Sequence, residues 1–201
     1  MRSDIDEVLQ YWFGELKEGF PGTDRSALWW KGEPSQDKEI KELFGKRVSQ
    51  ALRGELKAWE LTPRGQLAVI LLLDQFTRMI FRGTALAFQG DKEALRITKE
   101  ALQGGHHLAL EFAERLFLYM PLEHDENLQS QELCVGYIEE MLHEVPLHQR
   151  HQVDVALDFA MQHKDLIVQF GRFPHRNRVL DRESTALELV YLNQLHSHWG
   201  Q

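Results

Sequence analysis

Leu67–Gly83 reads LAVILLLDQFTRMIFRG, and the rest of the chain is organised around this segment. It begins with seven apolar residues and then admits Asp74, Arg78 and Arg82 without losing the pattern of a helix. Thr62-Pro63 supplies an N-cap and a first-turn proline, and the final glycine supplies a stop. Because a helix that is apolar on every side is buried, we predict a central buried helix here.

Apolar residues recur at three- and four-residue steps through most of the chain, which is typical of amphipathic helices. No segment alternates convincingly with a period of two, and no Asn-Gly or Asp-Gly hairpin signal occurs. We therefore predict an all-α protein, a single domain over residues 1–201 with roughly eight helices in antiparallel pairs. The helices are expected near residues 4–13, 34–53, 62–82, 91–103, 108–120, 128–142, 146–168 and 185–195.

The composition is that of an ordinary globular protein, with 43% hydrophobic and 27% charged residues among 201. A formal net charge of −8 argues against a general affinity for nucleic acid or anionic membranes, and we predict neither as a partner. Cys134 is the single cysteine, so no intrachain disulfide can form and a reducing compartment, the cytoplasm, is expected. The acidic N-terminus does not resemble a signal peptide, and seven apolar residues are too few to span a bilayer.

Two polar signals point to a binding site for an anion. Asp74, Arg78 and Arg82 recur at four-residue steps, so they form one stripe on the central helix, with Gln75 at its edge. The segment 172–182 crowds four arginines and a histidine into a break in the helical pattern. Guanidinium groups bind phosphate and carboxylate in bidentate fashion. We predict that the stripe and the segment form one pocket for a small anionic molecule.

The predicted ligand-binding residues are Asp74, Gln75, Arg78, Arg82, His124, Arg172, His175, Arg176, Asn177 and Arg178. The alternative is that these arginines pair with nearby carboxylates, which include Asp74, Glu123, Asp125 and Glu126, and only hold the fold together.

Glu123-His124-Asp125-Glu126 is a third polar signal, since carboxylates beside a histidine can do acid–base work or hold a metal. The spacing matches no established metal motif, and the interpretation we favour is an acidic cap on the following helix. We predict no metal and no cofactor. No glycine-rich phosphate loop or nucleophile motif occurs, so the catalytic residues, and whether the protein is an enzyme, are unknown.

Four motifs together resemble one family, the bacterial domain-of-unknown-function family nine hundred and twenty-four. This resemblance runs from about Val8 to Leu192 and implies an all-helical, tetratricopeptide-like fold, which is a right-handed helical array; it implies no activity. The motifs are Tyr11-Trp12-Phe13-Gly14, Leu72–Arg78 with Arg82-Gly83-Thr84, Phe117–His124, and Phe170–Asn177 with Arg182–Thr185.

Two hypotheses for function follow from the sequence. The first is the enclosed site for a small anionic ligand described above. The second is a helical scaffold that binds a protein or peptide partner, as tetratricopeptide-like surfaces do, with a purely structural arginine–carboxylate network.

Overall fold

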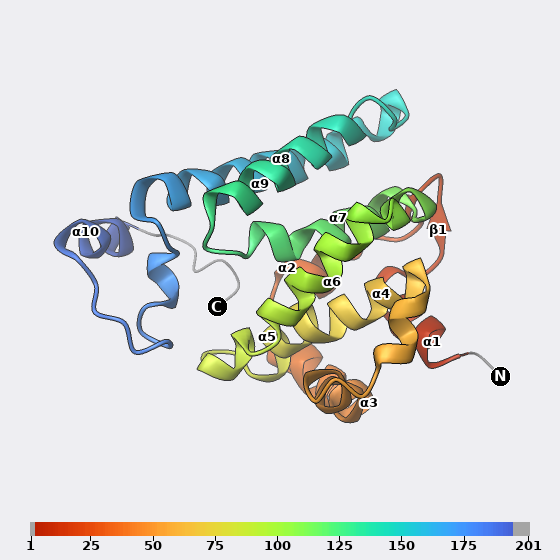
Figure 1. Ribbon diagram of the computed structural model, residues 1–201, viewed down its shortest axis with the longest axis horizontal. Coiled ribbons are helices and arrows are strands. Elements are labelled where there is room, and N and C mark those ends of the chain that lie inside the picture. Colours follow the sequence, from red (N-terminus) through yellow and green to blue (C-terminus); the bar gives the residue numbers. More distant parts are fainter. Residues whose placement is uncertain (1–2, 195–201) are drawn as a thin grey trace. The chain divides into compact units, whose positions relative to one another are not determined.

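The computed structural model describes residues 3–194, and their regular structure is almost entirely helical (Figure 1). Contacts between residues group the chain into two compact units. Unit 1 comprises Met1–Arg82 and Leu86–Pro121, and unit 2 comprises Gly83–Ala85 and Leu122–Gln201.

The predicted central helix is present in unit 1, in three consecutive parts: α4 (Pro63–Ile70), a π-helical segment (Leu71–Phe76) and α5 (Thr77–Ile80). Thr62 caps it as predicted, because its side-chain oxygen accepts the N–H of Gly65 at 3.1 Å. Every residue of the apolar run is buried. The apolar run thus forms the centre of the core of unit 1.

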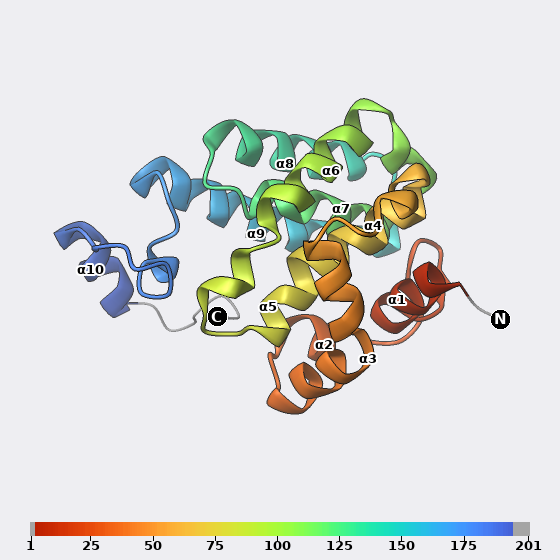
Figure 2. The ribbon, with the colours of Figure 1, turned by 60° about the horizontal axis from the view of Figure 1, so that its bottom comes forward.

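Three helices pack against this central helix. They are α1 (Asp4–Phe13), α3 (Pro34–Leu52) and α6 (Asp91–Gln103), and Figure 2 shows α1 and α3 close to α4 and α5. The short α2 (Ser26–Trp30) and α7 (Phe112–Glu123) complete the unit, although the last two residues of α7 belong to unit 2. Edge-to-face and tilted aromatic contacts join Trp12, Phe76 and Phe117, which fills the space between α1, the π-helical segment and α7.

A two-stranded antiparallel hairpin follows α1, with β1 (Leu16–Lys17) paired to β2 (Phe20–Pro21). The sequence predicts a turn near Gly19, and that glycine has a positive φ of 88°. The strands were not predicted, because two residues are too few to show the alternation by which strands are recognised. Short 3₁₀ turns occupy Lys57–Leu61, Ala85–Phe88, His106–Ala109, Leu147–Gln149 and Pro174–Arg176.

Unit 2 is built on an antiparallel pair, α8 (Leu128–Met141) and α9 (Arg150–Phe170), which lie side by side (Figure 1). The shorter α10 (Ala186–Gln194) follows the arginine-rich segment. Phe173 is fully buried and packs with Leu166 and Ile167 of α9. The arginine-rich segment is therefore anchored to the end of α9 by an aromatic side chain.

The prediction of an all-α fold is confirmed. The single domain over residues 1–201 and the tetratricopeptide-like, right-handed array stay predictions. Within residues 3–194, no helix combines the length and the apolar character that crossing a membrane requires.

Leu71→Ala is expected to lower the free energy of unfolding by about 2–5 kcal/mol, because Leu71 is fully buried in the central helix and its truncation leaves a cavity. Leu56→Ala should cost less, since Leu56 lies at the edge of a turn that can relax around the loss. Urea denaturation of both variants measures the difference, and equal midpoints would contradict the central place of Leu67–Phe81.

Candidate functional site

The polar stripe of the central helix finds its partners inside unit 1. Arg78 donates two hydrogen bonds to Asp91, at 2.7 and 2.9 Å, and its Nη1 lies 3.2 Å from Asp74 Oδ1. Gln75 donates from Nε2 to the other Asp74 oxygen at 2.6 Å. Arg82 makes a bidentate pair with Asp37 at 2.8 and 2.9 Å. Both arginines of the stripe therefore bind carboxylates of the chain itself.

The stripe begins in the π-helical segment, a rare conformation that is frequent at functional sites. Its wider turns change which backbone carbonyls are bonded within the helix. Side chains supply donors to two of them: Thr77 Oγ1 donates to the Leu73 carbonyl at 2.6 Å, and Arg78 Nη1 donates to the Asp74 carbonyl at 2.7 Å. Residues of the same helix thus stabilise this backbone, and its presence does not require a ligand.

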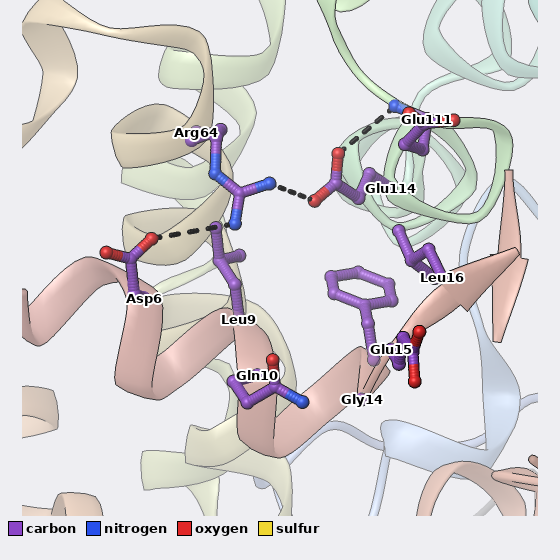
Figure 3. Close-up of a pocket in the computed structure, with 10 residues that line it drawn as sticks. Asp6, Leu9, Gln10, Gly14, Glu15, Leu16, Arg64, Glu111 and Glu114 are labelled. Atoms are coloured by element: carbon purple, nitrogen blue, oxygen red, sulfur yellow. Dashed lines mark hydrogen bonds and ion pairs between the residues drawn. The ribbon is translucent and has the colours of Figure 1, made fainter. Parts of the chain in front are cut away.

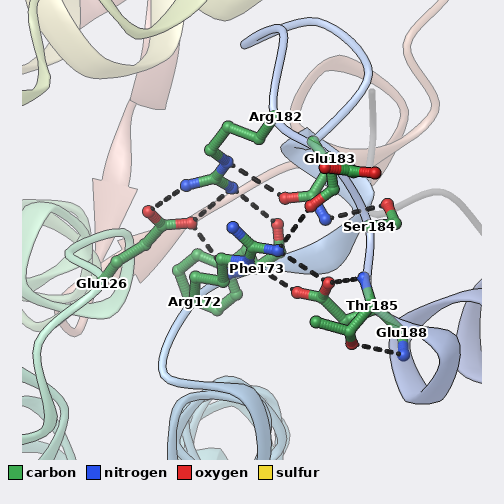
Figure 4. A network of polar contacts seen from close by, with 9 residues as sticks. Glu126, Arg172, Phe173, Arg182, Glu183, Ser184, Thr185 and Glu188 are labelled. Atoms are coloured by element: carbon green, nitrogen blue, oxygen red, sulfur yellow. Dashed lines mark hydrogen bonds and ion pairs between the residues drawn. The ribbon is translucent and has the colours of Figure 1, made fainter.

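The arginine-rich segment of unit 2 also pairs with carboxylates (Figure 4). Arg172 binds Glu188 through two hydrogen bonds of 2.6 and 2.7 Å, and Arg182 binds Glu126 through two of 2.6 and 2.9 Å. Asn177 is buried, and its Oδ1 accepts from Arg182 Nε at 3.0 Å. The alternative of a structural network therefore describes these side chains well.

Glu188 has two structural roles. It completes a capping box at the start of the last helix, because Oε2 accepts the Thr185 N–H at 2.7 Å while Thr185 Oγ1 accepts the Glu188 N–H. The hydrogen bonds from Arg172 are the largest cause that lowers the pKa of Glu188, to about 2, and the bond from Thr185 adds to them. One carboxylate thus holds both the start of α10 and the arginine-rich segment.

Glu188→Gln is expected to destabilise the protein at pH 7 and to do so less as the pH falls. A carboxyl whose pKa is lower in the folded state stabilises that state above its unfolded pKa of about 4.3. This contribution is lost as the pH falls through the folded pKa of about 2. Urea denaturation between pH 7 and about 2.5 should therefore show the two proteins converging in stability. A constant difference across this range would contradict the pairing.

The prediction that the acidic run caps the next helix is wrong. Asn127 caps α8, since its side chain accepts the N–H groups of Gln129 and Ser130 at 3.0 and 3.3 Å. The carboxylate of Asp125 accepts from the Ser130 hydroxyl at 2.6 Å. Glu126 pairs instead with Arg182, because a guanidinium is a stronger, charged partner than a backbone N–H of α8.

Three histidines gather around Phe173 in unit 2. The rings of His163 and His175 lie 5.4 and 5.6 Å from that of Phe173, and His124 lies 6.3 Å from His163. Arg176 is stacked over Phe173 at 4.5 Å and donates to the His124 carbonyl at 3.0 Å. Burial, followed by the charge of Arg176, lowers the pKa of His175 to about 3. His175 is thus neutral at pH 7 and contributes no positive charge to an anion site.

The predicted ligand residues fall into two groups that belong to different units. Asp74, Gln75, Arg78 and Arg82 lie in unit 1, whereas His124, Arg172, His175, Arg176, Asn177 and Arg178 lie in unit 2. Within each unit, contacts connect most members of the group. Arg178 of unit 2 is exposed to solvent instead. The shared pocket stays a prediction. Among residues 3–194, no group of three or more His, Cys, Asp or Glu side chains could hold a metal ion.

A pocket of about 460 Å³ lies beside α1 in unit 1 (Figure 3). Its apolar wall is formed by Leu9, Phe13 and Leu16. Its charged groups are the guanidinium of Arg64 and four carboxylates, which belong to Asp6, Glu15, Glu111 and Glu114. This volume lies within the range of small-molecule sites, although the lining is more polar than in most of them.

Glu114 is the most enclosed charge of this pocket, with a side chain 3% exposed. Arg64 Nη1 lies 2.8 Å from its Oε1, and its Oε2 accepts the N–H of Glu111 at 3.1 Å. Burial, which outweighs these two contacts, raises the pKa of Glu114 above its ordinary value. The same guanidinium reaches Asp6 at 3.7 Å, so it bridges two carboxylates.

A smaller pocket of about 310 Å³ also borders α1, at Gln10 and Tyr11, and Arg25 and Glu39 line it as well. The Tyr11 hydroxyl donates to Glu39 at 3.2 Å. Burial and the charge of Glu39 raise the pKa of Tyr11 to about 12. This tyrosine is therefore a neutral hydrogen-bonding group at pH 7.

Sequence reasoning did not find the residues of the pocket beside α1. Arg64 and Glu114 are 50 positions apart, and no local spacing joins them. The available signals were weak: a charged residue in the first turn after Thr62-Pro63, and a pair of glutamates three apart at the start of α7.

Comparisons with other proteins agree with the four sequence motifs. Residues 8–195 match a family described as a bacterial protein of unknown function, DUF924. The solved structure of a protein of unknown function, ATU0120 from Agrobacterium tumefaciens, has a similar fold, with a TM-score of 0.80 and 30% sequence identity. That similarity covers 95% of this chain and 97% of the other. No curated protein matches the chain. Because the family match spans nearly all of the sequence, the chain belongs to the DUF924 family of bacterial proteins of unknown function.

Proposed function

We propose that the protein is a helical binding protein whose ligand site is the pocket beside α1 in unit 1, and whose arginine–carboxylate pairs are structural. The observation that carries the proposal is Glu114, an enclosed carboxylate in the wall of a pocket large enough for a ligand. Burial of a carboxylate costs stability. A pocket that keeps one next to an apolar wall has the composition of a binding site.

The structural part of the proposal is supported by the partners of the arginines. Arg78, Arg82, Arg172 and Arg182 each face at least one carboxylate within 3 Å. A guanidinium already bound in this way would have to exchange its partner for a ligand. This favours the scaffold hypothesis over the anion pocket.

A thermal-shift screen tests the ligand site. It would use small organic molecules and capped single amino acids on the wild type and on Leu16→Trp, which fills the pocket. Leu61→Trp is the matched control, because Leu61 is 82% exposed and lies outside the pocket lining. A ligand at a hundredfold excess over its Kd adds about 2.7 kcal/mol of stability. This gain should vanish in Leu16→Trp and persist in Leu61→Trp, and equal gains in both variants would refute the site.

Binding of a small anion at the arginines is the second candidate. The density of arginines at 172–182 favours it, as does the buried Nδ1 of His175, which has no hydrogen-bond partner among residues 3–194 and can donate a neutral N–H to an anion. Inorganic phosphate at fixed ionic strength should then raise the melting temperature of the wild type but not of Arg172→Ala. A phosphate effect of the same size in both proteins, or none in the wild type, would remove this candidate.

A further inference from the structure

The pocket beside α1 has an excess of negative charge. Four acidic residues and one arginine line it, and the remaining lining is neutral. A cleft that is lined mainly by one sign of charge raises the local concentration of ligands with the opposite sign. An anionic ligand would meet repulsion in this pocket, whereas a cation would be attracted.

The contacts of Arg64 show that carboxylates of this pocket bind a cationic group. Its guanidinium lies between Glu114, at 2.8 Å, and Asp6, at 3.7 Å, as Figure 3 shows. Its side chain is 51% exposed, so it enters the pocket from the solvent side and is not locked in the core. The chain therefore already places one cation of its own against these carboxylates.

Two further carboxylates remain available to a ligand. Glu15 and Glu111 are exposed at the pocket and have no cationic partner within residues 3–194. Figure 3 draws both with the other lining residues of the pocket. A positively charged guest would supply these exposed carboxylates with a partner of opposite charge.

The apolar wall sets the second requirement. Leu9 and Phe13 are almost fully buried, so the half-buried Leu16 offers most of the exposed apolar surface in this lining. An aliphatic chain that packs against Leu16 would bury apolar surface, while a charged head reaches the carboxylates. The pocket thus suits a molecule with one positive end and an apolar stem.

We propose that this pocket, if it is the ligand site proposed above, takes a primary ammonium or guanidinium group on an aliphatic stem. The group comes either from a free alkylamine or from a lysine or arginine side chain of a peptide. Glu15 and Glu111 bind the charged head, and Leu16 holds the stem.

Isothermal titration calorimetry with probes of one stem length tests the charge preference. The probes are pentylammonium, pentylguanidinium, pentanol and hexanoate, each titrated into the full-length wild type. Both cations should bind, and their affinity should fall from about 0.01 M to about 1 M salt, over which the screening length drops from about 30 to about 3 Å. Hexanoate should not bind, and pentanol should bind more weakly than either cation.

Substitutions locate the effect. Glu15→Gln and Glu111→Gln should each weaken binding of the cations by about two- to fivefold, the range of an exposed ion pair. Glu132→Gln, an exposed glutamate of α8 outside the pocket lining, is the matched control and should change nothing. Arg64→Gln removes the chain's own cation from the pocket and should tighten binding. Unchanged or weaker binding to Arg64→Gln, in a protein with a native circular dichroism spectrum, would overturn the proposal.

Two capped pentapeptides, one with a central lysine and one with a central glutamate, test whether the positive charge comes from a peptide side chain or from a free amine. Tighter binding of the lysine peptide than of pentylammonium indicates a partner protein, and the reverse order indicates a free amine. If pentanol or hexanoate binds the wild type, the cations do not bind it, and Leu16→Trp abolishes that binding, the charge preference is refuted and the proposed site stands. If Leu16→Trp affects no probe, the proposed site itself fails.

Discussion

Asp74→Ala is expected to lower the free energy of unfolding by about 3–5 kcal/mol, the loss typical of a broken buried ion pair. Asp74 is 0% exposed, accepts a hydrogen bond from Gln75 and forms an ion pair with Arg78. Its removal leaves the Gln75 amide without this acceptor and opens space in a well-packed helix. Arg78 keeps Asp91, so the loss should fall short of unfolding the protein.

Asp4→Ala is the matched control for this substitution. Asp4 makes an ion pair of 2.7 Å with Arg47, but its side chain is 63% exposed. Exposed pairs contribute less than about 1 kcal/mol, because solvent and salt screen them. Urea denaturation at pH 7 measures both variants. Equal losses would mean that burial does not govern the strength of these pairs and that the interpretation of the central stripe is wrong.

Gly65→Ala is expected to cost at least about 3 kcal/mol, at or beyond the upper end of what an overpacked core usually loses. A Cβ at this position would lie 1.9 Å from the backbone oxygen of Trp59. Backbone cannot rotate away as a long side chain can, so the start of α4 would have to shift. That start carries the cap by Thr62 and leads directly into the buried apolar run.

Gly136→Ala provides the comparison, because it also places a methyl group on a helix. Apart from the adjacent residues and the nearby backbone of α8 itself, no atom of the described residues lies within 4 Å of a Cβ at Gly136, in the middle of α8. Alanine is the better helix former, so this variant should gain about 0.5–1 kcal/mol. The two substitutions should therefore shift the urea midpoint in opposite directions. A midpoint for Gly65→Ala at or above that of the wild type would show that α4 does not approach Trp59 so closely.

Local patterns predicted the helical elements because the signals that make a helix lie within a few residues. Thr62-Pro63 marks the start of the central helix, as the sequence indicated, and Thr185 with Glu188 forms a capping box before α10. The π-helical segment was not predicted. Its residues have ordinary helical propensities, and the widened turn depends on where Thr77 and Arg78 find acceptors.

The sequence by itself determined the all-α class, the family motifs, the buried central helix and the need for its charged stripe to find partners. The tertiary structure decided which residues those partners are. Arg82 meets Asp37 across 45 residues, and Arg64 meets Glu114 across 50. Propensity and capping act between neighbours in the chain, whereas an ion pair or a pocket depends on which helix faces meet. Burial then shifts the pKa of each enclosed charged group. The carboxylate pocket beside α1 exists only where the helices of unit 1 pack together, so local sequence patterns could not predict it.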